Sequence, residues 1–286
     1  MACCFVPMQS LEHSVTFIGN ATLLLRFGEL NVLTDPNFVH KGEQVSIGYG
    51  LHATRQTDPA CELADLPPID LLILSHFHGD HFDQVVEQRL DKSALIVTPP
   101  DAARELVARG FTNTHALRTW ETFEQTKGDS HVRVTATPGK HGPALVDFVL
   151  PEVMGSVLEL EDARVGLQLS VYLSGDTLLF DDLHEIPRRN PTIDLAFLHL
   201  GGTRVMGIMV TMDGKQGVEL AHIVQPRHMV PVHFDDYDLF SSPLSEFQAE
   251  VRRAGMEDRV TYLSRGDTFN LRRLQSDPVG PRHGLS

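Results

Sequence analysis

The feature that most constrains this chain of 286 residues is a histidine-rich run that directly follows a short apolar segment. Residues 69–74 are mostly apolar and follow Pro67-Pro68, which is the pattern of a buried strand. The run at residues 75–83 is Ser-His-Phe-His-Gly-Asp-His-Phe-Asp. Because Asp83 can cap the helix expected next, the run is predicted to form a loop between a buried strand and a helix.

Four side chains of this run are of the kinds that bind zinc, since zinc sites use neutral imidazole nitrogens and carboxylate oxygens. They are His76, His78, Asp80 and His81. In an extended loop His76 and His78 point the same way. Asp80 and His81 lie beyond the turn at Gly79 and can aim at a neighbouring point. This geometry predicts two metal ions rather than one.

Four side chains cannot saturate two metal ions, so further ligands are expected at the ends of later strands. Three residues fit this description, because each is of a ligand type and follows a predicted strand through small or turn residues. They are His141, Asp176 and His233. We expect all three to reach the same edge of the fold as the histidine-rich run.

Other polar residues are weaker candidates for the neighbourhood of the metals. Asp35 can hydrogen-bond a ligand histidine from behind, as metal sites usually require, or it can be a simple Asp-Pro turn. His199 is either a residue of the pocket or a buried histidine. Lys140 and Arg204 can contact an anionic group of the substrate or belong to the surface. The acidic run at residues 235–238 is expected to be solvated.

The pattern along the chain predicts an α/β fold. Strands are expected at residues 15–27, 31–34, 69–74, 94–98, 132–137, 156–161, 167–173, 195–200, 229–232 and 260–263, and helices at residues 84–90, 101–109, 215–223 and 244–254. Strands and helices in two similar halves favour a four-layer αββα sandwich of two mixed β-sheets. Residues 1–274 are expected to form one domain. Residues 275–286 are rich in Pro and Gly and are expected to form a flexible C-terminal tail.

Composition limits the partners. The net charge of −14, from 24 Lys and Arg against 38 Asp and Glu, has the wrong sign for binding phosphate backbones, so no nucleic acid partner is expected. The three cysteines form no Cys-x-x-Cys pair, and no secretory signal or membrane-length apolar run is visible. We therefore expect a soluble cytoplasmic protein with no transmembrane segment and a small-molecule substrate. The sequence is compatible with a homo-oligomer.

The sequence resembles the metallo-β-lactamase fold superfamily, whose His-x-His-x-Asp-His hallmark is matched at residues 76–81. The resemblance covers nearly the whole chain, at residues 15–271. It implies two zinc ions, with Mn²⁺ or Fe²⁺ as alternatives, and it gives a place to all seven ligand candidates. His76, His78 and His141 would hold the first zinc, Asp80, His81 and His233 the second, and Asp176 would bridge them.

Shorter motifs are similar to one branch of the superfamily, which includes L-ascorbate-6-phosphate lactonase and N-acyl-phosphatidylethanolamine phospholipase D. These motifs lie at residues 17–22, 33–36, 201–203 and 211–213. The chain differs from the branch at Asn20, where histidine is frequent. It differs also at residues 204–210, which look like an insertion.

The resemblance implies a metal-dependent hydrolase whose nucleophile is a zinc-bridged hydroxide, because coordination lowers the pKa of water from about 15.7 towards 7. Asp80 and His233 are the ligands expected to take part directly in catalysis. The expected substrate is a small-molecule ester, lactone or phosphodiester. Two alternatives stay open: an iron-dependent sulfur dioxygenase-type oxidoreductase, and a phosphodiesterase that acts on lipid or nucleotide.

Two segments are expected to wall the substrate pocket: the long loop at residues 37–68 and the stretch at residues 142–155. Their candidate apolar contacts are Phe38, Tyr49, Phe148 and Leu150, and their candidate lid residues are His40 and His52.

Overall fold

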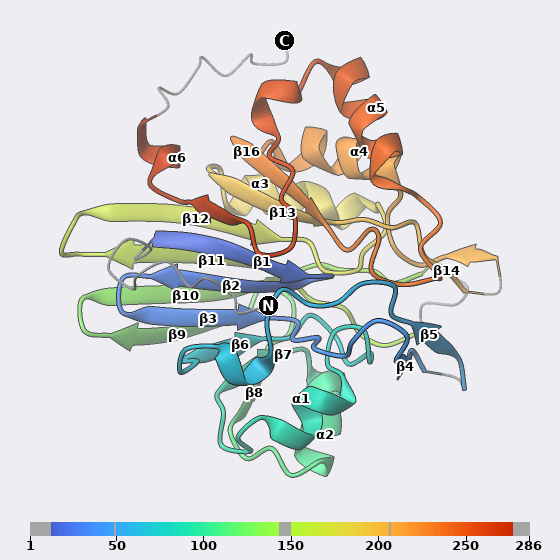
Figure 1. The fold of residues 1–286 in the computed structure, drawn as a ribbon. Coiled ribbons are helices and arrows are strands. Elements are labelled where there is room, and N and C mark those ends of the chain that lie inside the picture. The colour runs from blue at the N-terminus through green and yellow to red at the C-terminus, as the bar shows by residue number, and fades with distance from the viewer. Residues whose placement is uncertain (1–12, 49, 143–149, 206, 277–286) are drawn as a thin grey trace.

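Two β-sheets that pack face to face form the centre of the fold in the computed structural model (Figure 1). The structure describes residues 13–48, 50–142, 150–205 and 207–276. Within these ranges the larger sheet has seven strands in the order β17-β1-β2-β3-β6-β7-β8, and the smaller has six in the order β16-β13-β12-β11-β10-β9. Both sheets are mixed, because each contains parallel and antiparallel neighbours.

The bounds of the strands follow the apolar segments of the sequence. The larger sheet contains β1 His13–Gly19, β2 Thr22–Phe27, β3 Leu30–Thr34, β6 Leu71–Ile73, β7 Ile96–Thr98, β8 Thr114–Ala116 and β17 Thr268–Asn270. The smaller sheet contains β9 Thr122–Lys127, β10 Ser130–Thr137, β11 Gly155–Asp162, β12 Leu167–Leu173, β13 Leu195–His199 and β16 His228–Val232. Two short hairpins add β4 Gln44–Ser46 with β5 His52–Thr54, and β14 Arg204–Val205 with β15 Ile208–Met209.

Helices cover the outer faces of both sheets. They are α1 Gln84–Arg89, α2 Pro100–Ala108, α3 Glu185–Arg189, α4 Gly214–Val224, α5 Leu244–Ala254 and α6 Arg273–Ser276, with 3₁₀ turns at η2 Leu63–Asp65, η3 Asp181–His184 and η4 Glu257–Arg259. Figure 1 shows α1 and α2 on one side of the sheets and α4 and α5 on the other. Among the described helices, none is long and apolar enough to cross a membrane.

Alternation along the central parallel strands gives them two apolar faces, one towards the other sheet and one towards the outer helices. On β6, Leu71 and Ile73 belong to the core between the sheets, whereas Leu72 packs in the outer cluster with α1 and α2. On β13, Phe197 belongs to the central core and Leu198 to the cluster beneath α4 and α5. Because both faces are buried, the central strands are almost wholly apolar. The predicted αββα sandwich is confirmed.

The carboxyl ends of several strands meet at one edge of the sandwich. In the larger sheet β3, β6 and β7 are parallel neighbours, and in the smaller sheet β12, β13 and β16 are. β10 runs in the same direction as β12, since both are antiparallel to β11. The segments after these strands therefore converge, and they carry all of the predicted metal ligands.

The prediction of a strand at residues 260–263 is wrong. Val260 makes only an isolated bridge to Met229. A turn follows, in which the Ser264 backbone N–H donates to Asp267 Oδ2 at 2.8 Å. This turn reverses the chain before β17, which pairs with β1 in place of the predicted strand.

Other differences arise where the sequence lacks a clear apolar pattern. β9 was not predicted, because this edge strand is mostly polar and mostly exposed. The segment at residues 15–27 is two strands rather than one, since the chain turns at Asn20 between β1 and β2. The loop at residues 37–68 contains the hairpin β4–β5. The predicted tail lies outside the described residues from residue 277 on, and its first two residues belong to α6.

Asp83 connects the histidine-rich loop to the segment after β3. Its Oδ1 accepts the backbone N–H of Val86 at 2.9 Å and caps α1, as predicted from the sequence. Its Oδ2 accepts the backbone N–H groups of Phe38 and of Val39, the latter at 2.7 Å. One buried carboxylate therefore satisfies three backbone donors from two segments.

We predict that Asp83→Ala lowers the free energy of unfolding by about 3 kcal/mol, because it removes a helix cap and leaves two further buried amides without an acceptor. The control is Asp213→Ala, since Asp213 caps α4 through Gln216 alone, and about 1 kcal/mol is expected there. Urea denaturation of the chelator-treated proteins measures both. Equal losses in the two variants would contradict the role of Asp83 as a link between segments.

Candidate metal centre

The first ligand group consists of imidazole nitrogens from His76, His78 and His141. His76 and His78 lie in the loop after β6, and His141 lies in the segment after β10. His76 Nε2 is 3.1 Å from His78 Nδ1, and His141 Nε2 is 3.4 Å from the same atom. Three imidazole nitrogens that converge in this way are the ligands that zinc prefers.

The second ligand group consists of Asp80, His81, Asp176 and His233, all of which are buried. Asp176 Oδ2 lies 3.4 Å from His81 Nε2 and 3.6 Å from His233 Nε2. Asp80 Oδ2 lies 3.4 Å from His233 Nε2. The other oxygens of Asp80 and Asp176, together with His81 Nε2, have no hydrogen-bond partner among the described residues. Buried polar atoms without partners are unfavourable, and a cation would satisfy all three.

For three of the ligand histidines, the ring nitrogen that does not face the cluster has a hydrogen-bond partner within 3.0 Å, and the corresponding Nδ1 of His81 lies 3.4 Å from Ser75 Oγ. The pairs are His76 Nδ1 with Ser75 Oγ at 3.0 Å, His141 Nδ1 with the Val210 carbonyl at 2.9 Å, and His233 Nδ1 with the Leu200 carbonyl at 3.0 Å. A backbone carbonyl requires the proton on Nδ1, which leaves Nε2 free to bind a metal. This arrangement is typical of metal sites, and the residues present fit a metal pair.

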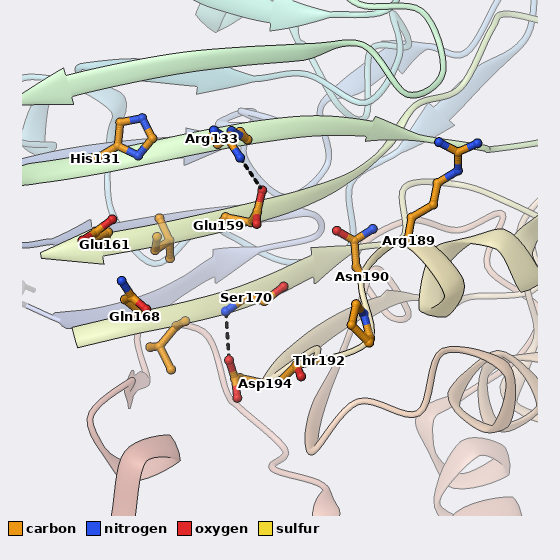
Figure 2. A pocket seen from close by; sticks show the side chains of 13 residues that line it. His131, Arg133, Glu159, Glu161, Gln168, Ser170, Arg189, Asn190, Thr192 and Asp194 are labelled. Carbon is orange, nitrogen blue, oxygen red and sulfur yellow. Dashed lines mark hydrogen bonds and ion pairs between the residues drawn. The ribbon is translucent and has the colours of Figure 1, made fainter. Parts of the chain in front are cut away.

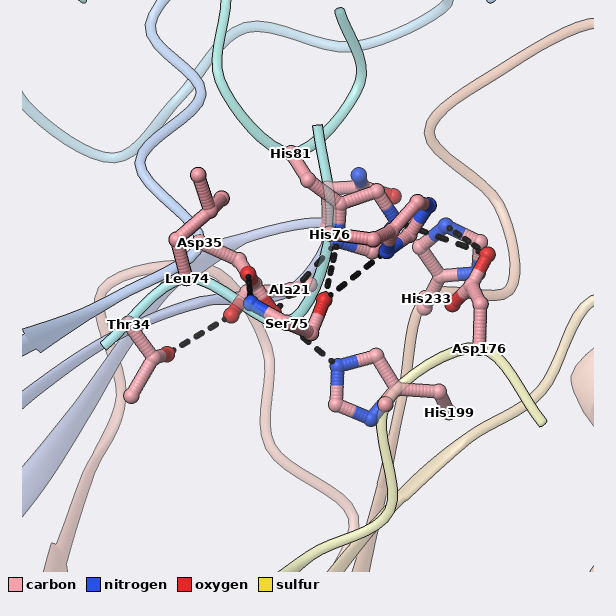
Figure 3. Close-up of polar contacts among 12 residues, drawn as sticks. Ala21, Thr34, Asp35, Leu74, Ser75, His76, His81, Asp176, His199 and His233 are labelled. Carbon is pink, nitrogen blue, oxygen red and sulfur yellow. Dashed lines mark hydrogen bonds and ion pairs between the residues drawn. The ribbon is translucent and has the colours of Figure 1, made fainter. Parts of the chain in front are cut away.

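Asp35 lies behind His81 and contacts two histidines (Figure 3). Its Oδ2 is 3.4 Å from His81 Nδ1 and 3.5 Å from His199 Nε2. Its Oδ1 accepts the backbone N–H of Ser75 at 2.7 Å. His199 Nδ1 is in turn 3.2 Å from Ser174 Oγ. The structure thus brings Asp35 and His199 together beside the second ligand group, and His199 is buried there.

The first ligand group has little tendency to hold protons. Burial, followed by repulsion from His81, keeps the pKa of His76 well below its usual value. Burial and repulsion from His141 lower the pKa of His78 to about 3. Burial also lowers the pKa of His141. These imidazoles are therefore neutral near neutral pH, which is the form that binds metals.

The second ligand group has the opposite tendency. Burial by itself lowers the pKa of His81, but attraction by Asp176, Asp80 and Asp35 outweighs it and raises the pKa well above its usual value. Burial is likewise outweighed at His233, where Asp176 is the main cause of the raised pKa. Burial raises the pKa of Asp80, but the two histidines lower it to about 2. The second group thus pairs carboxylates with imidazoles that hold a proton more strongly than a free histidine does.

Two basic and two histidine candidates lie apart from the ligand groups. Arg204 is exposed, and its guanidinium donates to a backbone carbonyl of its own hairpin at 3.3 Å. The ammonium of Lys140 is 5.9 Å from the centre of the Phe180 ring. His40 and His52 are exposed. In the described contacts, none of these four side chains touches a ligand residue.

The structure corrects the prediction for the apolar pocket walls. Phe38 is fully buried in the cluster with α1 and α2, so it does not line a pocket, and the prediction is wrong. Leu150 is half-buried. Tyr49 and Phe148 lie outside the described residues.

The structure also corrects the prediction for the acidic run at residues 235–238. Asp235 and Asp238 are exposed, as expected. Asp236 is fully buried and forms an ion pair with Arg55 at 3.0 Å, so the expectation of a solvated carboxylate is wrong for this residue. The local sequence does not distinguish the buried carboxylate of Asp236 from its exposed neighbours, because the arginine that pairs with Asp236 lies far away in the sequence.

Two further residues contact the ligands and were not among the site residues predicted from the sequence. Thr211 Oγ1 donates to Asp176 Oδ2 at 3.0 Å. Asn20 Nδ2 donates to the backbone carbonyl of Asp80 at 2.7 Å. Both lie in the short motifs at residues 211–213 and 17–22 that carry the family resemblance, and this was the signal that could have indicated them.

A cavity of about 470 Å³ lies elsewhere, on the outer face of the smaller sheet (Figure 2). Its lining includes Arg133, Glu159, Ser170 and Asp194 and none of the ligand candidates. Arg133 is paired with Glu159 at 3.6 Å, and Ser170 donates its backbone N–H to Asp194 at 2.9 Å. Such side chains are typical of an antiparallel sheet that faces water on one side, so this cavity is not part of the metal centre.

An αββα sandwich with imidazole and carboxylate groups at one edge defines a class of metal-dependent enzymes. The family model described as the beta-lactamase superfamily domain matches residues 30–234. The chain belongs to this metallo-β-lactamase superfamily, as the sequence predicted.

Relatives in sequence agree with this class. A UPF0173 metal-dependent hydrolase of Opitutus terrae is 29% identical over 269 residues, which cover 90% of this chain and 99% of the relative. One of Pyrococcus furiosus is 24% identical over 257 residues, with the same coverage of 90% and 99%. The prediction of a metal-dependent hydrolase is confirmed.

Solved structures show the same fold. An isothiocyanate hydrolase from Delia radicum gut bacteria has a TM-score of 0.74 and 22% identity, and the match covers 90% of this chain and 98% of that structure. A diiron β-hydroxylase from Streptomyces venezuelae has a TM-score of 0.66 and 18% identity, and the match covers 91% of this chain and 54% of that structure. At these identities the likeness concerns the fold alone.

We predict that metal bound at the second ligand group is lost before metal at the first as the pH falls. The raised pKa values of His81 and His233 mean that protons compete with metal there at a higher pH than at the first group. The lowered pKa values of His76 and His78 delay this competition at the first group until acid pH. Elemental analysis after dialysis at steps from about pH 8 to about pH 5 should show one equivalent lost first. Simultaneous loss of all metal would contradict the assignment.

Proposed function

We infer that the enzyme binds two zinc ions and cleaves an ester, lactone or phosphodiester bond of a small molecule. The observation that carries this proposal is the convergence of seven ligand-type side chains into two neighbouring groups at one edge of the sheets. Imidazole-rich groups favour zinc over the harder cations that prefer oxygen, with manganese and iron as alternatives. Metals held there would supply an ionised water as nucleophile near neutral pH.

The chain's own residues would divide the work between the two groups. His76, His78 and His141 would hold the first ion, and Asp80, His81 and His233 the second. Asp176 would serve both. Its carboxylate contacts His81 and His233, and its charge partly offsets the lowering of the pKa values of the three histidines of the first group by burial. The hydroxyl of Thr211 and the carboxylate of Asp35 would fix Asp176 and His81 in place.

A small molecule is the favoured substrate because of the charge of the chain. A net charge of −14 repels long polyanions, and the basic candidates Lys140 and Arg204 do not touch the ligand groups in the described contacts. Nothing in the proposal requires a serine or cysteine nucleophile. Ester and lactone bonds are slightly preferred over phosphodiesters.

The second candidate function is an iron-dependent oxidoreductase of the sulfur dioxygenase type. The diiron β-hydroxylase with the same fold shows that this sandwich also accommodates redox enzymes. The identity of the bound metal separates the two candidates, since the redox reaction requires iron and hydrolysis does not.

We predict that Asp176→Ala lowers the catalytic rate by at least about 100-fold and reduces the bound metal below two equivalents. The reason is that this carboxylate contacts two histidines of the second group and its charge acts on the histidines of the first group. The control is Asp182→Ala, an exposed carboxylate in η3. Elemental analysis and circular dichroism accompany the assay. A folded Asp176→Ala variant with full activity and two metal equivalents would refute the bridging role.

We predict that the zinc-loaded enzyme is most active on a small ester or lactone. The test is a panel of lactones, nitrophenyl esters, bis-nitrophenyl phosphate, an isothiocyanate, glutathione persulfide and RNA. The reference is the Asp176→Ala variant, which removes activity that arises from contaminants. RNA cleavage faster than every small substrate, or oxygen consumption with the persulfide by iron-loaded enzyme, would overturn this choice.

A further inference from the structure

A buried ion pair lies behind the second ligand group and is not explained by metal binding alone. Arg55 and Asp236 are both fully buried, and Arg55 Nη2 is 3.0 Å from Asp236 Oδ1. Gly19 leaves room for the pair, since a Cβ there would lie 2.9 Å from Arg55 Nη2. Burying two charges costs free energy that their mutual attraction often fails to offset, so such a pair is expected to have a further role.

The Asp236 carboxylate gathers donors from three distant segments. Beside Arg55, it accepts from Arg265 Nε at 3.0 Å and from Thr57 Oγ1 at 2.5 Å. Its Oδ2 accepts the backbone N–H of Asn20 at 2.8 Å. Asn20 has a φ of 53°, in the left-handed region that asparagine tolerates better than most residues. Asp236 therefore holds the backbone of Asn20 in an unusual conformation.

Asn20 links this ion pair to two metal-ligand candidates. Its side-chain Nδ2 donates to the backbone carbonyl of Asp80 at 2.7 Å. Its own carbonyl accepts the backbone N–H of His233 at 3.0 Å. Asp80 and His233 come from opposite sheets and both belong to the second ligand group. Asn20 thus fixes the distance between the two backbones that present these ligands.

Asn37 forms a second link from the same ion pair. Arg55 Nη1 and the Tyr237 hydroxyl both donate to Asn37 Oδ1, the latter at 2.8 Å. With its oxygen held in this way, the Asn37 amide donates from Nδ2 to the backbone carbonyl of Gly79 at 3.0 Å. Two asparagine amides therefore hold two consecutive carbonyls, those of Gly79 and Asp80.

We propose that Asn20 and Asn37, oriented by the Arg55–Asp236 pair, are positioning residues that set the metal affinity of the second ligand group. This inference rests on the proposed two-metal function. Both links end on backbone groups next to or within the second group. In the first group, His76 contacts Ser75 and His141 contacts Val210, and neither of these contacts involves Asn20 or Asn37. Loss of a link is therefore expected to weaken the second metal and to spare the first.

The test is zinc titration of the chelator-treated protein by calorimetry, with Asn20→Gly as the main variant. Glycine adopts the φ of Asn20 without strain and keeps the backbone bonds to Asp236 and His233, so only the amide bond to Asp80 is lost. The affinity for one equivalent should fall by about 10- to 100-fold, and that for the other by less than about 2-fold. Asp80→Ala, which removes a ligand of the second group alone, identifies which equivalent belongs to it.

The control is Asn31→Ala. Asn31 Nδ2 donates to the Pro68 carbonyl at 3.0 Å, a bond of the same kind on β3, and its loss should leave both zinc affinities unchanged. If circular dichroism shows that Asn20→Gly does not fold, Asn37→Ala is titrated with zinc instead, and the same loss of affinity for one equivalent is expected. Equal weakening of both equivalents, or no change in either, in a folded variant overturns the inference while the two-metal function stands. A wild-type protein that binds one equivalent overturns both.

Discussion

The structure depends on the compensation of charge buried at one edge of its two sheets. Asp80 and Asp176 are buried carboxylates. The Oδ1 atom of each lacks a hydrogen-bond partner in the described chain, and His81 Nε2 lacks one as well. Ionised groups in a low-dielectric interior are strongly unfavourable unless they are paired or bind a metal. The raised pKa values of His81 and His233 show one form of compensation, in which protons supply the positive charge. A cation that replaces these protons supplies it more completely, because it satisfies oxygens and nitrogens together.

The rest of the fold keeps this cluster from relaxing. Three of the five described non-glycine residues with positive φ are Asn20, Asp35 and His233, all at the candidate metal centre. Backbone conformations of this kind cost about 1 to 3 kcal/mol each and persist only where neighbouring contacts determine them. Asp35 is held by a backbone bond to Ile73 at 3.0 Å and by the Ser75 amide, and His233 by a backbone bond to Asn20. The strain lies where side chains must be aimed, which agrees with a rigid, preorganised site.

The sequence was sufficient for the elements that have a local pattern. The His-x-His-x-Asp-His run after a buried strand supplied four of the seven residues that lie together in the two groups, and the ends of later strands supplied the other three. The apolar segments predicted most strands and the αββα layers. The sequence was not sufficient where burial depends on a distant partner. Nothing near Arg55 distinguishes it from a surface arginine, and nothing near Asp236 distinguishes it from its exposed neighbour Asp235. Their burial follows only once the loop after β5 and the loop after β16 are brought together by the sheets.

If the two-zinc proposal holds, charge also explains how an acidic chain can act on an anionic or strongly polar substrate. On the two-zinc proposal, two divalent cations bring four positive charges against the two carboxylates Asp80 and Asp176, while His76, His78 and His141 remain neutral. With the hydroxide of the proposal counted as well, the ions and these carboxylates leave about one positive charge, opposite in sign to the net charge of −14 of the whole chain. A buried positive site attracts the oxygen on which negative charge develops during ester or phosphodiester cleavage, and it does so over a short range. The acidic surface repels long polyanions before they reach that range, so this distribution of charge favours small substrates over polymers.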